Sequence, residues 1–185
     1  MEQEQTKKLN RIHCLSISFN PLIEKVPEIF SIEGKNRKSK FTKDLLKNKL
    51  EGSFEKIVLI KTCQRVELYI NSDKQPEDLK KYFFHTYGKF FSDDFGKTVK
   101  VFSANDCLIH LTRQSAGFES FITGETEIYH QVKELFGRYH ADGLTDLFLD
   151  ETFDRCLLMA KEMRSIVLKK HDIYSYPELL TQLFV

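Results

Sequence analysis

Cys63 and Arg65 stand two positions apart in the segment Lys-Thr-Cys-Gln-Arg-Val-Glu, which spans residues 61–67. An unbroken apolar run at 57–60 precedes the cysteine and residues 66–70 alternate apolar and polar, so it is predicted to lie at a strand end. A thiol at a strand end can meet a ligand, and a guanidinium nearby favours the thiolate and can clamp a carboxylate. The pattern fits a nucleophile, but taken alone it is a weak signal that favours a packing role, because a free cysteine more often acts as a small buried hydrophobe.

A second segment, residues 110–133, reads His-Leu-Thr-Arg-Gln-Ser-Ala-Gly-Phe-Glu-Ser-Phe-Ile-Thr-Gly-Glu-Thr-Glu-Ile-Tyr-His-Gln-Val-Lys. The two segments, in this order, resemble the N-terminal catalytic domain of glutamyl-tRNA reductase. That family usually reads Ser-Thr-Cys-Asn-Arg-Thr/Val-Glu at the first site and carries His-Leu, Gly-Leu-(Asp/Glu)-Ser, Gly-Glu and Gln-Val-Lys at the second. The resemblance runs from about Ile12 to about Val167. Lys61 and Gln64 depart from the first pattern, and residues 19–21 match only loosely the family's Asn-His-Lys-like segment.

The resemblance implies attack by the Cys63 thiolate on the ester of glutamyl-tRNA(Glu), giving a glutamyl thioester. Hydride from NADPH would then give glutamate-1-semialdehyde, a step of tetrapyrrole (5-aminolevulinate, porphyrin) biosynthesis. Arg65 would clamp the side-chain carboxylate of the substrate, with a surface ion pair to Glu67 as its alternative role. His110 would donate a proton or position the thioester during reduction, and is otherwise a core histidine. The remaining predicted substrate-binding residues are Thr62, Gln64, Ser120, Glu125, Thr126, Glu127 and Gln131. Of these, Glu125 and Gln131 could equally be ordinary helix residues.

The first hundred residues predict an α+β unit. Strand patterns cover 12–19, 56–60, 66–70 and 98–102, and helical patterns cover 38–50 and 77–91. The resulting β-α-β-β-α-β order is typical of a ferredoxin-like sandwich, in which two helices back four antiparallel strands. Cys63 would lie in the connection of the central hairpin.

Three helices are predicted after this unit. The first starts at the capping-type sequence of residues 103–106 and ends at Gly117, the second covers 123–140 with Gly143 as its stop, and the third covers 145–164. The expected domains are therefore an α+β half at 1–102, which carries the nucleophile, and a helical half at 103–170, which completes the glutamate pocket. The functional cleft is expected between them.

Residues 171–185 are expected to begin a linker toward an NADPH-binding domain that the chain lacks, because no Gly-x-Gly-x-x-Gly occurs in the sequence. NADPH is therefore expected to bind elsewhere, and no metal is expected. The implied partners are glutamyl-tRNA(Glu), a second copy through an absent C-terminal domain, and glutamate-1-semialdehyde aminotransferase; a membrane is not among them.

Composition fits a soluble globular protein, and the sequence shows neither a secretory signal nor an apolar stretch long enough to span a bilayer, so a cytoplasmic location is expected. The 185 residues are 41% hydrophobic and 30% charged with a net charge of +1, which does not favour nonspecific binding of a long polyanion. A basic run at 35–49 is interpreted as the solvated face of a helix, with a phosphate contact as the alternative. Three of the four cysteines, Cys14, Cys107 and Cys156, lie among apolar residues and are interpreted as packing residues.

Two other functions remain open at this point. A noncatalytic ferredoxin-like RNA-binding module would bind tRNA without Cys63, and a cofactor-independent cysteine acyl hydrolase or transferase would turn over without any nucleotide. Neither explains the second segment as well as the reductase domain does.

Overall fold

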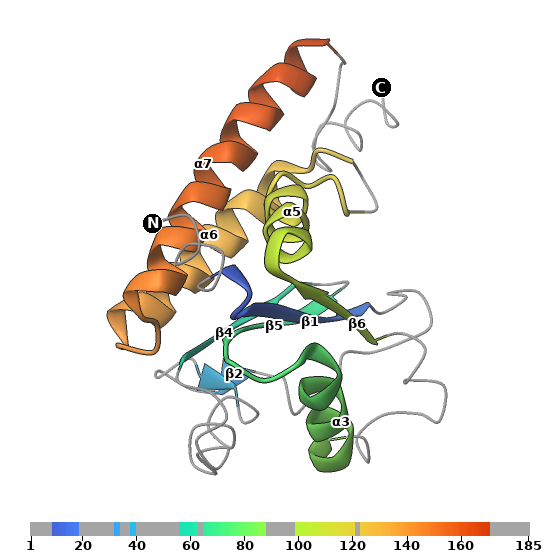
Figure 1. The fold of residues 1–185 in the computed structure, drawn as a ribbon. Helices are drawn as coiled ribbons and strands as arrows, with labels where there is room; N and C mark the ends of the chain where they lie inside the picture. Colours follow the sequence, from blue (N-terminus) through green and yellow to red (C-terminus); the bar gives the residue numbers. More distant parts are fainter. Residues whose placement is uncertain are drawn as a thin grey trace, which may run out of the picture. The chain divides into compact units, whose positions relative to one another are not determined.

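The computed structural model describes residues 9–18, 32–33, 38–39, 56–62, 65–87, 99–120 and 123–170 (Figure 1). The chain divides into two compact units, Met1–Ala104 and Asn105–Val185. The strands are β1 (Ile12–Ser18), β2 (Ile32–Glu33), β3 (Lys38–Ser39), β4 (Lys56–Lys61), β5 (Arg65–Asn71) and β6 (Val99–Ser103). The helices are α3 (Pro76–Tyr87), α5 (Ala104–Ser115), α6 (Thr126–Ala141) and α7 (Leu147–Lys170).

The first unit is built on a four-stranded sheet with the order β4-β5-β1-β6. Every neighbouring pair is antiparallel, which confirms the predicted α+β class and the predicted hairpin of β4 and β5. In the register, Ser16 lies opposite Glu67 and Ser18 lies opposite Arg65. Since side chains alternate across a strand, these two cross-strand pairs lie on the same face of the sheet.

The apolar residues of the strands form the core of this unit. Leu15, Ile17, Leu68 and Ile70 are at most 4% exposed. Helix α3 follows strand β5 in the chain and lies along one face of the sheet (Figure 1), contributing Leu79 and Phe83 to the buried set. Burial of such side chains contributes about 1.5–3 kcal/mol each, so this layer stabilises the framework that carries the β4–β5 turn.

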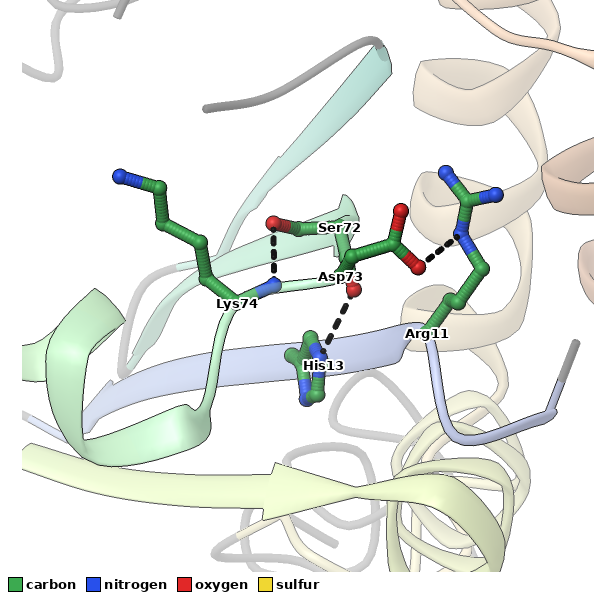
Figure 2. A network of polar contacts seen from close by, with 5 residues as sticks. All are labelled: Arg11, His13, Ser72, Asp73 and Lys74. Atoms are coloured by element: carbon green, nitrogen blue, oxygen red, sulfur yellow. Dashed lines mark hydrogen bonds and ion pairs between the residues drawn. The ribbon is translucent and has the colours of Figure 1, made fainter. Parts of the chain in front are cut away.

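A polar network ties the start of β1 to the connection that follows β5 (Figure 2). The ring of His13 donates from Nε2 to the carbonyl oxygen of Ser72 at 3.2 Å, and its Nδ1 lies 2.9 Å from Ser103 Oγ. Arg11 Nε lies 3.2 Å from a carboxylate oxygen of Asp73. Burial lowers the pKa of His13, partly offset by the Ser72 carbonyl. The network therefore holds a neutral histidine between three segments of the sheet unit.

In the second unit, α6 and α7 pack through stacked aromatic rings. The centroids of Phe136 and Phe153 are 4.5 Å apart with an interplanar angle of 6°. Gly143 ends α6 with φ +67, donating to the carbonyl of His140 at 2.9 Å, and Asp146 Oδ1 accepts from the N–H of Leu149 at 2.8 Å at the start of α7. The Gly143 stop is the one that the sequence predicted, whereas the Asp146 bond was found only in the structure.

One predicted element differs from the structure. Residues 38–39, expected to start a helix, form strand β3 paired with β2, and the rest of the predicted helix and most of the basic run lie outside the described residues. Ser103 ends β6 and directly precedes α5, so the predicted helix start is confirmed, while the Ser103 hydroxyl is also bonded to His13.

Candidate functional site

The turn between β4 and β5 is closed by two short-range hydrogen bonds. The N–H of Thr62 donates to the carbonyl oxygen of Arg65 at 2.9 Å, and the N–H of Arg65 donates to Thr62 Oγ1 at 3.2 Å. Thr62 is only 5% exposed. The predicted nucleophile Cys63 and its neighbour Gln64 connect these two residues and lie outside the described residues. The structure therefore describes the two residues that flank the nucleophile and the bonds that join them.

Behind this turn, the sheet buries a carboxylate. Glu67 has no exposed surface, and its two oxygens accept hydrogen bonds from Ser16 Oγ at 3.2 Å and from Tyr69 Oη at 2.9 Å. A surface ion pair between Arg65 and Glu67, the alternative role for the arginine, is wrong because Glu67 is not at the surface. Glu67 alternates with apolar residues on β5, a pattern that does not by itself indicate a buried carboxylate.

Lys61, which stands where the family usually has serine, ends β4 immediately before the turn. It is half-buried, and this burial lowers the pKa of its ammonium group. A cation at this position adds positive potential to the same short segment as Arg65, and a positive neighbourhood favours a thiolate.

His110 belongs to the buried face of α5 together with Cys107, Leu111 and Gln114. The spacing of these residues, three and four positions apart, is that of one helix face. His110 is 5% exposed. Cys107 and Cys156 in this unit and Cys14 in the sheet unit are buried and form no disulfide, as expected for packing residues.

The loop between α5 and α6 carries the other predicted substrate residues. Ser120 and Glu125 are half-buried, Thr126 and Glu127 are exposed in the first turn of α6, and Gln131 is half-buried one turn later. Glu125 is the residue that precedes the helix, and its side chain makes no capping hydrogen bond. Burial, and secondly the charge of Glu127, raise the pKa of Glu125. Ser120, Glu125 and Gln131 are thus partly shielded from water, whereas Thr126 and Glu127 are open to solvent.

Gly117 and Gly124 close this loop at its base. Gly117 ends α5 with φ +78, and its carbonyl accepts from the N–H of Gly124 at 2.9 Å. A Cβ on Gly117 would lie 2.6 Å from the carbonyl oxygen of Glu125, so only glycine fits this close approach. The glycines of the second motif therefore have a structural reason in the loop that presents Ser120 and Glu125.

The sequence matches the family model described as "Glutamyl-tRNAGlu reductase, N-terminal domain" over residues 15–167. Glutamyl-tRNA reductases of Methanosarcina mazei and Shewanella amazonensis are 32% and 28% identical over 65% and 61% of this chain, which covers 26% and 27% of their lengths. The solved structure titled "Glutamyl-tRNA Reductase from Methanopyrus kandleri" matches with a TM-score of 0.58 at 23% identity, over 84% of this chain and 35% of that one.

The chain combines a sheet unit of the α+β class with a helical unit, and it carries both sequence motifs in the order that the reductase family has. The family match extends over most of the chain, so the chain belongs to the glutamyl-tRNA reductase N-terminal domain family. It spans about a quarter of the length of the curated relatives. Among the described helices, none is long and apolar enough to cross a membrane.

Proposed function

We propose that this chain is the thioester-forming domain of a glutamyl-tRNA reductase in tetrapyrrole biosynthesis. The observation that carries the proposal is the family match over residues 15–167, which includes both segments that the sequence singled out for chemistry. The buried state of the three other cysteines also supports Cys63 as the nucleophile, because a thiol without solvent access reacts slowly.

In the proposed reaction, the thiolate sulfur of Cys63 attacks the carbonyl carbon of the ester that joins glutamate to tRNA. The carbon–sulfur bond forms, the carbon–oxygen bond breaks, and the ribose oxygen of the tRNA leaves and takes up a proton. A thioester is more electrophilic than the ester it replaces, which prepares the acyl group for reduction. Arg65 binds the side-chain carboxylate of the glutamyl group through its planar guanidinium.

Residues of both units are proposed to serve this substrate. Thr62 and Gln64 supply hydrogen bonds to the glutamyl group, and His110 donates a proton or positions the thioester when it is reduced. The helical unit contributes the half-buried Ser120 and Glu125, and the remaining proposed contacts are Thr126, Glu127 and Gln131. Because Thr126 and Glu127 are exposed and lie in the first turn of α6, we assign them contacts at the margin of the substrate.

NADPH does not fit the part of the chain that the structure describes. The sheet of four described strands is antiparallel, whereas dinucleotide folds use parallel strands, and the sequence contains no Gly-x-Gly-x-x-Gly. We therefore assign the hydride step to another part of the reductase. A ferredoxin-like arrangement of the first unit, a dimer, an aminotransferase partner and a cytoplasmic location remain predictions that follow from the family resemblance.

Radiolabelled glutamyl-tRNA tests the proposal. After incubation without NADPH, the chain should retain label in a hydroxylamine-sensitive bond, and mass spectrometry should locate the adduct on Cys63. Cys63→Ser should lose nearly all of it, because an alkoxide is far harder to generate at neutral pH than a thiolate. Cys156→Ser, which changes a buried thiol, is the matched control and should keep the adduct.

The two alternatives give different outcomes in the same assay. Binding of tRNA without any covalent label would identify an RNA-binding module. Sustained release of glutamate at many turnovers, without accumulation of label, would identify a cofactor-independent hydrolase.

A further inference from the structure

Arg164 of α7 reaches the two ends of the loop that connects α5 with α6. Its Nη1 donates to the carbonyl oxygen of Ala116 at 3.0 Å and to that of Glu125 at 2.9 Å. These partners lie 48 and 39 residues earlier in the chain. A single nitrogen of one helix therefore joins the residue where the loop begins to the residue where it ends.

The carbonyl of Glu125 also lies close to the backbone of Gly117. The absent Cβ of Gly117 would lie 2.6 Å from this oxygen, so the glycine provides the space in which the carbonyl sits. Arg164 then supplies the hydrogen bond that this carbonyl accepts. Because Glu125 directly precedes α6, fixing its carbonyl also fixes the backbone from which its side chain projects.

The environment of Arg164 is unusual for a cation. Arg164 is 7% exposed, its two acceptors are neutral carbonyls, and its Nη2 is buried without a hydrogen-bond partner. Burial lowers the pKa of Arg164, but a guanidinium remains charged at neutral pH. Among the described residues no carboxylate pairs with Arg164, and a buried cation without such a partner is costly, whereas an apolar side chain would avoid that cost. The buried arginine therefore gives less stability than an apolar side chain would, but it fixes the two carbonyls at the ends of the loop.

We propose that Arg164 is a positioning residue for glutamyl-tRNA binding, acting by holding the carbonyls of Ala116 and Glu125 together so that the side chain of Glu125 and the nearby Ser120 are presented in fixed positions. The inference rests on the proposed function, since those two residues are proposed to contact the glutamyl group. It assigns to α7 a role in substrate binding that neither sequence motif contains.

The test compares Arg164→Met with Arg155→Met, which changes an exposed arginine of the same helix. Arg164→Met should raise the KM for glutamyl-tRNA in thioester formation about tenfold or more, because small displacements of binding groups are expensive. The rate of Cys63 alkylation by iodoacetamide should not change, since the nucleophile lies on the other unit. Arg155→Met should resemble the wild type in both assays.

Hydrogen exchange provides a readout that does not depend on activity. In Arg164→Met, the N–H of Gly124 should exchange faster while the amides of the α6 interior keep their protection. Arg164→Lys, which can still donate to one of the two carbonyls, should restore part of the KM and part of the protection.

An unchanged KM in Arg164→Met would overturn the inference, whether or not exchange at Gly124 accelerates. If Arg164→Met fails to fold, Arg164→Lys decides: a wild-type KM in that variant with faster exchange at Gly124 would also overturn it. A wild-type chain that forms no thioester at all would overturn the proposed function and, with it, this inference.

Discussion

The two loops that carry the predicted site residues are held in different ways. The β4–β5 turn is closed by bonds between Thr62 and Arg65, which are three positions apart. The α5–α6 loop is closed by a close approach of Gly117 to Glu125 and by a side chain 39 residues beyond Glu125. The first loop depends on its own hairpin, whereas the second depends on the packing of α7. Changes in the two loops should therefore affect stability and activity to different degrees.

The largest effect is expected at Gly117. Gly117→Ala places a Cβ 2.6 Å from a backbone oxygen at φ +78, which should lower the free energy of unfolding by about 3 kcal/mol. Gly143→Ala is the matched control, because Gly143 also has positive φ, +67, but nothing lies within 4 Å of its added Cβ. That variant should lose only about 1 kcal/mol. Urea denaturation of both variants measures the difference, and equal losses would show that the close approach does not constrain the loop.

Gly137 provides a third comparison, because alanine at this position is expected to raise the free energy of unfolding rather than lower it. It lies within α6 with open space around its Cβ position. Gly137→Ala should therefore stabilise the protein by about 0.5–1 kcal/mol through helix propensity. A loss of stability in this variant would mean that the denaturation assay does not report the local geometry of the helical unit.

A substitution in the β4–β5 turn should lower the rate of thioester formation without changing the free energy of unfolding. Arg65→Lys keeps the charge and the backbone bonds to Thr62 but cannot reproduce a two-pronged contact with a carboxylate, so thioester formation should fall about tenfold or more. The urea midpoint should stay close to that of the wild type. Near-normal thioester formation by Arg65→Lys would remove the proposed clamp.

Thr62 should contribute a modest local stability. Thr62→Val keeps the shape of the side chain but removes the oxygen that accepts from the N–H of Arg65, at a cost of about 1 kcal/mol. Hydrogen exchange should accelerate in the β4–β5 hairpin and remain unchanged in α5, α6 and α7. Faster exchange in those helices would contradict the local character of this turn.

The smallest expected effects are changes in stability with pH, and these should have opposite signs in the two units. The folded sheet unit lowers the pKa of His13, so its neutral form contributes stability that is complete above the unfolded pKa and is lost as the pH falls below it. The folded helical unit raises the pKa of Glu125, so its charged form costs stability above that pKa and the cost disappears on acidification. Urea midpoints measured at several pH values should show a weaker acid dependence in His13→Asn and a stronger one in Glu125→Gln.

The sequence by itself determined the elements of this fold that depend on nearest neighbours. Apolar alternation and helical spacing predicted β1, β4, β5, β6, α3, α5, α6 and α7 to within a few residues, except that α7 continues to Lys170, and the local chemistry of Gly143 predicted the end of α6. The motif around Cys63 and the second motif also indicated the family that the comparison confirmed. These signals are local because a strand or a helix repeats its exposure pattern within a few residues.

Only the tertiary structure decided what the polar residues contact. Glu67 alternates with apolar neighbours as an exposed residue would, yet it is buried because Ser16 and Tyr69 satisfy its oxygens across and along the sheet. Arg164 reads as one more cation on an amphipathic helix, but its partners are carbonyls 39 and 48 residues away. Hydrophobic periodicity reports which face of an element is buried, while the partner of a polar group depends on which distant segment packs against it.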